Sequence, residues 1–567
     1  MDYMDTLKAR PDWDWLNEIA LTTLSRGYLR LNENDSDIKA AAIQRVDEIV
    51  THAEKILGCE LPTIRLGFKR GWVSPSSPVW SNFGNLRGLP ISCNGSYMED
   101  RMEGILFTNA EIGMMTKLGA GTSCYMGELR PHGSDISGGG KSHGPAHFAR
   151  LLQETVQVIS QSNVRRGNCA IWLDIDHPDI HDWLMIRSIT DGVHHSIQHL
   201  SFGVCISDKW MQEMLAEEKG GAKRLIMAKL INRRRACGYP YIFFTDTVNN
   251  AKPQVLKDKD IKIHASNLCA EIMLPSNTEE SFVCNLSSVN VLFFDEWKDT
   301  NLIKEMIYFL DAIMTEYINK SKDMLFMNRA YNFAKRWRAI GLGTLGYHSY
   351  LQAKGIAFES EKAREENIKI HKYLSEKSHK ASREMAKIYG EPEGLKGYGM
   401  RHLCLNAIAP TTSSSIILGQ ISPSIEPWEA NYFENDNAKG VFTQKNLILE
   451  KLLIEKGKND NETWISILQH GGSVQHLSFL SDEEKKIFKT FAEIDMFEIL
   501  KQAADRQQFI DQGQSLNLKI LPSESKKFNF EIIKFAWENK IKSLYYHKGI
   551  NAAQELARGN ICIECEA

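Results

Sequence analysis

Residues 266–275 read SNLCAEIMLP, and they place a single cysteine between an amide and a carboxylate. If this stretch is extended, alternate side chains share a face, so Asn267, Cys269 and Glu271 point the same way. With a rise of roughly 3.3 Å per residue, Cys269 lies about 7 Å along the chain from each polar neighbour, close enough for all three to touch one small polar molecule. The residues alone leave a second interpretation open, in which a strand end carries a structural cysteine and a solvated glutamate.

The composition indicates a soluble globular protein with an ample apolar core. Of the 567 residues, 43% are hydrophobic and 25% charged, which favours two to four domains or one large catalytic unit with appendages. The net charge of −3 provides no bulk electrostatic match to nucleic acid or to an anionic membrane. Neither nucleic acid nor a membrane is therefore expected as a partner.

The start of the chain and its cysteines indicate the compartment. Residues 1–20 contain early acidic side chains and no apolar signal segment, and no apolar run reaches the roughly 18 residues that a membrane span needs. The 11 cysteines lack the spacing of a small disulfide-rich scaffold. We therefore expect a cytoplasmic protein whose thiols are reduced and available for chemistry.

Helical and strand-like patterns alternate along the chain. Apolar residues recur at intervals of three and four in SDIKAAAIQRVDEIVTHAEKIL (36–57), which is typical of an amphipathic helix. Similar patterns predict helices over residues 106–118, 146–160, 302–325, 360–388 and most of 433–512. Short apolar runs such as YIFF (241–244) predict strands between them. This alternation favours an α/β layered or barrel architecture.

Two glycine-rich strings resemble nucleotide-binding motifs without meeting their requirements. DISGGGKS (135–142) has Asp135 where a phosphate loop needs glycine, and no apolar strand leads into it. GLGTLG (341–346) follows a basic, helix-like segment rather than a buried strand. Close backbone packing is the favoured interpretation of the second string.

Three further segments carry groups that can do chemistry. APTTSSS (409–415) could open a helix whose N–H groups and hydroxyls converge on an anion, or it could be an ordinary polar turn with a helix cap. Tyr545 and Tyr546 would face opposite sides of a strand, where core packing is the default role. Cys562 and Cys565 form the single C-x-x-C of the chain, which suits thiol–disulfide exchange better than a zinc site.

These features occur together with Cys93 in LPISCNGS and Cys284 in SFVCNLSSVNV. In this order they resemble the large, catalytic (alpha) subunit of class I ribonucleotide reductase. The resemblance implies an α/β fold, a ten-stranded α/β barrel with a central finger loop that carries the radical cysteine. It divides the chain into a helical N-terminal domain (1–88), the barrel core (89–400), a region that completes the barrel and holds the phosphate loop and the tyrosine pair (401–548), and a flexible redox tail (549–567).

The resemblance also implies the reaction, the reduction of ribonucleoside diphosphates to 2′-deoxyribonucleoside diphosphates for DNA replication. Cys269 would be the thiyl radical that removes hydrogen from the ribose 3′ carbon. Glu271 would be the general base on the 3′ hydroxyl, and Asn267 would hold the hydroxyls by hydrogen bonds. Cys93 and Cys284 would supply two electrons and end as a disulfide, since pairing depends on proximity in the fold rather than in the sequence.

By the same resemblance, this chain binds no cofactor covalently. A metal-containing small (beta) subunit would supply the radical, which Tyr545 and Tyr546 would relay towards Cys269. Cys562 and Cys565 would reduce the buried disulfide and be reduced in turn by thioredoxin or glutaredoxin.

Nucleotide contacts follow from the same matching of motifs. The substrate would be held by Ser77, Ser92, Asn267, Glu271 and a phosphate loop made of Pro410, Thr411, Thr412, Ser413, Ser414 and Ser415. A deoxynucleoside triphosphate or ATP would act as specificity effector at the interface of a homodimer. The effector residues would be Asp100, Arg130 and Arg165.

One departure from the family pattern carries its own expectation. The helical domain begins around residues 13–29, which leaves no room for the N-terminal ATP-cone of many relatives. We therefore expect no overall-activity site, so dATP would act only as a specificity effector. Two other functions remain open at this stage: a cobalamin-dependent reductase, and a thiol-exchange or zinc-binding interaction protein whose chemistry lies in the tail.

Overall fold

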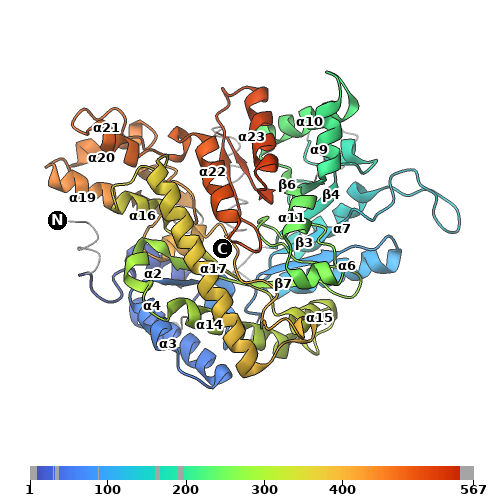
Figure 1. Cartoon of the computed structure of the whole chain (residues 1–567), viewed down its shortest axis with the longest axis horizontal. Coiled ribbons are helices and arrows are strands. Elements are labelled where there is room, and N and C mark those ends of the chain that lie inside the picture. The colour runs from blue at the N-terminus through green and yellow to red at the C-terminus, as the bar shows by residue number, and fades with distance from the viewer. Residues whose placement is uncertain are drawn as a thin grey trace.

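The structure is a computed structural model, in which strands lie at the centre and helices surround them (Figure 1). Among the residues that the structure describes, no helix is both long enough and apolar enough to cross a membrane. The described residues are 9–29, 31, 37–86, 88–159, 167–188, 197–437 and 440–549.

The N-terminal region is mainly helical, as its pattern predicts. Asp37 caps the longest of its helices by accepting a hydrogen bond from the Ala40 N–H, and Gly58 ends it in the left-handed conformation that glycine tolerates. One short strand of this region pairs antiparallel with a central strand of the barrel. The elements are α2 (Glu18–Ser25), α3 (Ile38–Leu57), α4 (Pro62–Lys69), β1 (Val73–Pro75) and α5 (Ser77–Asn82).

Five parallel strands with helical crossovers form the first half of the main sheet. Crossover helices shield these strands from solvent, which is why the strands read as apolar runs. The strands are β2 (Cys93–Tyr97), β3 (Thr122–Tyr125), β4 (Cys169–Asp174), β5 (Ser201–Ile206) and β6 (Tyr241–Phe244). The helices between them are α6 (Met102–Lys117), α7 (Pro145–Val158), α8 (Ile180–Trp183), α9 (Asp208–Ala216) and α10 (Ala222–Cys237), so the predicted helices 106–118 and 146–160 are confirmed.

The second half is built on the long, fully buried strand β7 (Phe282–Asn290). It runs antiparallel to β2 and parallel to β8 (Ile340–Leu345). The helices of this half include the predicted segments 302–325 and 360–388, and α17 runs diagonally from beside α16 towards α15 (Figure 1). They are α11 (Thr245–Ala251), α12 (Gln254–Asp258), α13 (Phe294–Trp297), α14 (Leu302–Ser321), α15 (Asn328–Trp337), α16 (Tyr347–Ala353) and α17 (Glu361–Tyr389).

Backbone hydrogen bonds continue the sheet around the barrel beyond its regular strands. The strand β12 (Ser543–Leu544) pairs with β6, and the following Tyr545 N–H donates to the Leu516 carbonyl. The 513–515 segment bonds to Ile408, and Leu342 of β8 donates to the Leu405 carbonyl. The predicted count of ten strands is not confirmed, because the described residues contain nine regular strands in this sheet and the other links are single bridges.

The string GLGTLG lies in β8 except for its last residue, Gly346, which caps the start of α16. A Cβ atom on Gly343 would lie 2.4 Å from the Ala407 carbonyl oxygen, and one on Gly341 would lie 2.4 Å from the Leu286 side chain. Close backbone packing therefore explains these glycines, as the sequence favoured.

The C-terminal part is less purely helical than its sequence pattern predicts. An antiparallel hairpin of β9 (Tyr432–Asn437) and β10 (Gly440–Lys445) precedes the helices, so the prediction of helix from residue 433 is wrong there. The other elements are α18 (Thr412–Ile417), α19 (Leu447–Glu455), α20 (Asn461–Gln469), α21 (Asp482–Ile487), α22 (Met496–Gln507), α23 (Lys526–Glu538), β11 (Leu518–Lys519) and β13 (His547–Lys548).

Candidate active site

The segment that contains Cys269 is a turn and not an extended strand. Asn267 Oδ1 accepts hydrogen bonds from the N–H groups of Glu271, at 3.0 Å, and Ile272, at 3.1 Å. Ala270 has a φ of 63°, in the left-handed region. The expectation of an extended stretch is therefore wrong, because the asparagine side chain satisfies the backbone and closes a tight turn. We call residues 266–273 the finger.

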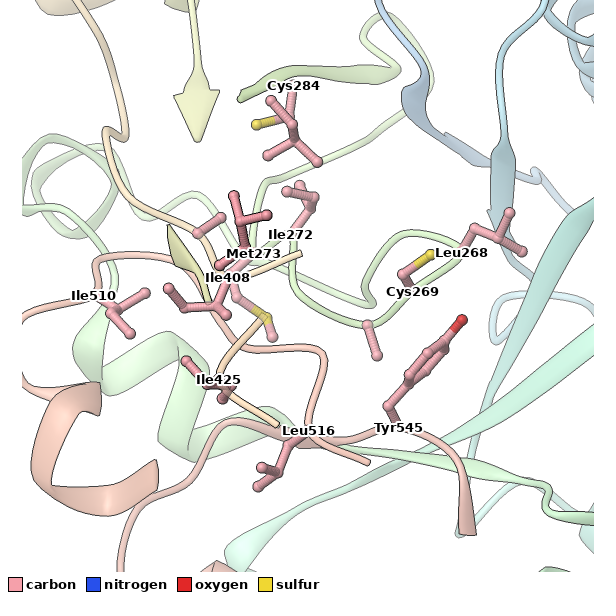
Figure 2. Close-up of a cluster of buried hydrophobic side chains, with 14 of the residues drawn as sticks. Leu268, Cys269, Ile272, Met273, Cys284, Ile408, Ile425, Ile510, Leu516 and Tyr545 are labelled. Carbon is pink, nitrogen blue, oxygen red and sulfur yellow. The ribbon is translucent and has the colours of Figure 1, made fainter. Parts of the chain in front are cut away.

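Residues far along the chain hold the finger in place (Figure 2). The Ser515 hydroxyl lies 2.7 Å from the Cys269 carbonyl oxygen and 3.0 Å from Glu271 Oε2. The Ser543 hydroxyl donates to the Ala270 carbonyl at 2.6 Å. These contacts satisfy buried carbonyls of a segment that pairs with no strand in the described part of the chain. They fix the position of the thiol between them.

One pocket brings the finger together with several of the other residues that the sequence singled out. Cys269 reaches it with 7% of its surface exposed, whereas Glu271 and Asn267 expose only 1% each. Its wall also contains Ser92 and Cys93, which come from the N-terminal half of the chain. The lining residues are Ser74, Ser76, Ser77, Pro78, Ser92, Cys93, Gly121, Asn267, Leu268, Cys269, Glu271, Leu286, Ser287, Ser288, Ala409, Pro410, Thr411 and Ser414.

The sheet places Cys93 directly opposite Cys284. The two residues are register partners on the antiparallel strands β2 and β7, and Cα atoms at such positions lie about 4.5–5.5 Å apart, within the range of a disulfide. Both are free thiols here. Their surroundings differ, because Cys93 is half-buried and lines the pocket while Cys284 is fully buried behind it. This pairing joins residues that are far apart in sequence.

Each of these two thiols receives an N–H group from a side-chain amide. Asn267 Nδ2 donates to Cys93 Sγ at 3.6 Å, and Gln512 Nε2 donates to Cys284 Sγ at 3.3 Å. Burial raises the pKa of Cys284 well above its usual value, and the Gln512 hydrogen bond opposes that rise. The neutral thiol is therefore the resting form of Cys284.

Glu271 is buried, and no cation lies beside it among the residues that the structure describes. Burial raises the pKa of Glu271 to about 7, while the hydrogen bonds from its own backbone N–H, from Asn267 and from Ser515 lower it. A carboxyl with this pKa can exchange a proton near neutral pH, which a general base needs.

Tyr545 and Tyr546 contact one another and do not face opposite sides of a strand. Their ring centroids lie 4.3 Å apart, because both residues fall in the irregular link between β12 and β13. The Tyr545 hydroxyl is directed towards Cys269 (Figure 2). The Tyr546 hydroxyl lies 3.1 Å from that of Tyr239, and the Tyr241 ring packs against both tyrosines. Aromatic rings thus continue from the finger to the N-terminal end of β6.

The phosphate-loop segment reaches the pocket through part of its length. Pro410, Thr411 and Ser414 line the cavity, and α18 begins at Thr412, so the predicted helix opening is confirmed. Thr411 Oγ1 accepts a hydrogen bond from the Ser424 N–H at 2.7 Å. The pocket lining does not include Thr412, Ser413 or Ser415, and the Ser415 hydroxyl donates to the Thr412 carbonyl inside the helix.

Several pocket residues were missed by the sequence patterns. The hydroxyls of Ser76 and Ser287 are buried and have no hydrogen-bond partner among the described residues. Ser287 and Ser288 follow Cys284 on β7, so a search of that strand for polar groups would have found them. Gln512, which contacts Cys284 behind the pocket, has no such signal, because it comes from a segment that is distant in the sequence.

The expected effector residues lie outside this pocket. Arg130 Nε and Asp100 Oδ2 form an ion pair at 2.7 Å, and Arg130 also donates to the Asp135 carbonyl at the base of an exposed hairpin. The pocket lining includes neither residue. Arg165, Cys562 and Cys565 lie outside the described residues.

Comparison with known proteins shows the family of the chain. The sequence matches the family described as "Ribonucleotide reductase, barrel domain" over residues 91–220, 221–397 and 392–547. The fold is similar to a solved structure described as the class Id ribonucleotide reductase alpha subunit of Actinobacillus ureae. The two share a TM-score of 0.89 and 48% sequence identity, and the match covers 96% of this chain and 99% of that one.

Viral relatives show the same similarity at the sequence level. The chain is 33% identical to a putative ribonucleoside-diphosphate reductase large subunit of Frog virus 3 (isolate Goorha), across 88% of this chain and 91% of that protein. It is 32% identical to the ribonucleoside-diphosphate reductase large subunit of Invertebrate iridescent virus 3, across 84% and 86%. The chain therefore belongs to the family of class I ribonucleotide reductase large, catalytic subunits.

Proposed function

We propose that the pocket reduces ribonucleoside diphosphates to 2′-deoxyribonucleoside diphosphates by radical chemistry. One observation carries the proposal: Cys269 and Cys93 line the same pocket, and Cys93 has Cys284 as its register partner. A radical reduction needs one sulfur to start the reaction and two more to supply electrons. The asymmetric placement of the three thiols meets that need.

Cys269 would begin the reaction as a thiyl radical that takes the hydrogen atom from the ribose 3′ carbon. Glu271 would accept the proton of the 3′ hydroxyl, which its raised pKa allows near neutral pH. The Asn267 amide is well placed to orient the sugar hydroxyls, because its oxygen holds the turn and its nitrogen faces Cys93. The finger would thus bring acid–base and radical groups to the same sugar face.

Cys93 and Cys284 would complete the reduction. The 2′ hydroxyl leaves as water, the two thiols give up two electrons and two protons and become a disulfide, and Cys269 returns a hydrogen atom to the 3′ carbon. The sum is one ribonucleotide and two thiols converted to one deoxyribonucleotide, one water and one disulfide. The register of β2 and β7 supports this pairing, since it needs no movement of the sheet.

The diphosphate would lie against the hydroxyl-rich wall. Thr411 and Ser414 line the pocket beside the start of α18, and the buried Ser76 and Ser287 hydroxyls have no partner among the described residues. Neutral hydroxyl and backbone donors can bind phosphate oxygens without a fixed cation. Ser77 and Ser92 would contact the nucleoside.

Partners would supply the radical and the electrons. A small, metal-containing beta subunit would deliver the radical, and the contact of Tyr545 with Tyr546 supports a relay towards Cys269. Cys562 and Cys565 would carry electrons from thioredoxin or glutaredoxin to the disulfide. A deoxynucleoside triphosphate or ATP would bind near the paired Asp100 and Arg130, together with Arg165, and set substrate specificity.

A second copy of the chain would complete the enzyme as a homodimer. The helices α6 and α7 expose large apolar side chains although they pack together through the hydrogen bond of Thr155 with Asn109. The exposed side chains repeat at intervals of four and seven residues, so each helix presents a stripe. They are Met102, Leu106, Leu151 and Val158.

The Cys269→Ser variant tests the proposal. Assayed with a matching small subunit, dithiothreitol and a ribonucleoside diphosphate, this variant should yield no deoxyribonucleotide, because a serine hydroxyl cannot replace the thiyl radical. The exposed Cys59 provides a control, and Cys59→Ser should retain wild-type turnover. Turnover by the Cys269→Ser variant would refute the radical assignment.

A further inference from the structure

The two thiols of the proposed dithiol differ in how easily another molecule can reach them. Cys93 is half-buried on the pocket wall, 3.8 Å from the Ser92 hydroxyl. Cys284 has no exposed surface. An incoming thiolate could attack either sulfur of a disulfide between them. The sulfur that the thiolate can reach more easily is attacked preferentially. Only the Cys93 side faces the pocket.

Gln512 occupies the opposite, closed side of the pair. Its Nε2 atom lies 3.3 Å from Cys284 Sγ and 3.0 Å from the Ile340 carbonyl oxygen, so the amide uses both of its hydrogens. Its Oε1 atom accepts a hydrogen bond from the Met273 N–H at 3.2 Å. The side chain is fully buried and held at three points, from the finger to β8. Its N–H is therefore fixed in direction.

We propose that Gln512 is a positioning residue that holds Cys284 as the leaving group when the Cys93–Cys284 disulfide is reduced, so that the reductant attacks Cys93. The inference rests on the proposed function, since it assigns a direction to the recycling of the same dithiol. Burial disfavours a thiolate at Cys284, and an oriented amide N–H is the kind of group that offsets that cost. Charge-assisted hydrogen bonds strengthen as the thiolate forms.

The step balances as an ordinary thiol–disulfide exchange. A thiolate of a dithiol reductant attacks Cys93 Sγ, the sulfur–sulfur bond breaks, and its electron pair stays on Cys284 Sγ as a thiolate stabilised by Gln512. That thiolate then takes up the proton released by the reductant. The second thiol of the reductant attacks its own sulfur in the mixed disulfide and frees Cys93. The reductant leaves as a disulfide, and both protein thiols are restored.

Trapping the mixed disulfide tests the direction of attack in the unaltered pocket. Full-length chain with Cys562→Ser and Cys565→Ser is oxidised and treated with glutathione, which cannot complete the second step by itself. Acid quenching, alkylation with N-ethylmaleimide in denaturant and peptide mass spectrometry locate each group. Glutathione on Cys93 and maleimide on Cys284 are expected. Glutathione on Cys284 would overturn the proposal.

A pair of matched variants tests the role of the amide. Gln512→Met keeps the length of the side chain and removes its donor, and it should slow reduction of the disulfide by dithiothreitol about tenfold or more. Gln514→Met makes the same change two residues away at an equally buried position that bonds to Arg506, Ala503 and Gln507 and to no thiol. It should reduce at the wild-type rate. Equal rates for both variants would contradict the assignment to Gln512.

The outcomes separate this inference from the proposed function. If oxidation yields no Cys93–Cys284 disulfide at all, the assigned dithiol itself is wrong. If the disulfide forms and is attacked at Cys284, only the direction of recycling is wrong. Should Gln512→Met fail to fold, the glutathione experiment on the chain with Gln512 intact still decides the direction of attack.

Discussion

Glu271 shows how burial sets the chemistry of one side chain. Its carboxyl has an ordinary pKa of 4.5 and a pKa of about 7 in the folded chain, because burial penalises the charged form. At a pH between these two pKa values, the Glu271 carboxyl therefore binds a proton when the chain folds. The contribution of this group to stability falls as pH rises through that window, so the site is less stable where the base is ionised.

The same pKa predicts the pH dependence of turnover. Activity should fall as pH drops below about 7, because the proposed base becomes protonated. Ser515→Ala removes a hydrogen bond that favours the carboxylate, and it should move the acid limb to higher pH by about one unit. Initial rates with saturating substrate across pH 5–9 measure the limb. An unchanged limb in Ser515→Ala would contradict this account of the pKa.

Tyr546 makes a second prediction at the scale of one residue. The Tyr546→Phe variant loses the hydroxyl that contacts Tyr239 but keeps the ring that packs against Tyr545 and Tyr241. Nucleotide binding should be unchanged while turnover with the small subunit disappears, since phenylalanine cannot carry a proton-coupled electron. Equilibrium dialysis and a product assay measure the two properties. Normal turnover would remove Tyr546 from the relay.

At the scale of elements, the packing of β8 determines where the second half of the sheet can close. Gly343 lies against the backbone of Ala407, and the Cβ of any other residue would come within 2.4 Å of that carbonyl oxygen. Backbone cannot move aside as a flexible side chain does. The 404–408 segment can therefore approach β8 only where glycine leaves space.

Gly343→Val should consequently destabilise the chain. Overpacking of a well-packed site costs about 1–3 kcal/mol, and a contact with backbone belongs at the upper end of that range. Thermal unfolding followed by circular dichroism should show a lower midpoint. Glu376→Ala, an exposed change on α17, is the control and should leave the midpoint unchanged. Equal midpoints for both variants would contradict the packing argument.

Local sequence patterns predicted the helices and strands well, but they predicted the contacts between distant residues poorly. The helices α3 and α17 were predictable because their buried residues recur along one face of each. The finger was misread as extended because the side chain of Asn267 replaces sheet partners, a tertiary effect that a period of two cannot reveal. The tyrosine pair was misoriented for a related reason, since both residues lie beyond the end of β12.

At the scale of the whole molecule, half of the site could be found from the sequence and half could not. Cys269, Cys93 and Cys284 were identifiable because their motifs occur together in the order typical of the family, although each motif is weak by itself. Ser515 and Gln512 were not, because they reach the finger from 244 and 239 positions away. Long-range supports of this kind depend on the closed barrel and leave no local signature.

The exposed apolar stripes of α6 and α7 lead to a prediction about assembly. The double variant Leu106→Glu with Val158→Glu places charges where a second copy would pack. Sedimentation should show a dimer for the wild type, as we propose, and a monomer for the double variant. Leu225→Glu is the control, because Leu225 is equally exposed on α10, away from these helices. A wild-type chain that sediments as a monomer would contradict the homodimer.

The long reach of the finger's supports also has a consequence for synthesis on the ribosome. Ser543 bonds to Ala270 across 273 positions, and Gln512 and Ser515 are likewise made long after the cysteine that they hold. At about 5–20 residues per second, the nascent chain carries an unsupported turn for a time on the order of tens of seconds. The finger thus has all of these supports only after Ser543 has been translated, so a product that ends before that residue would lack them.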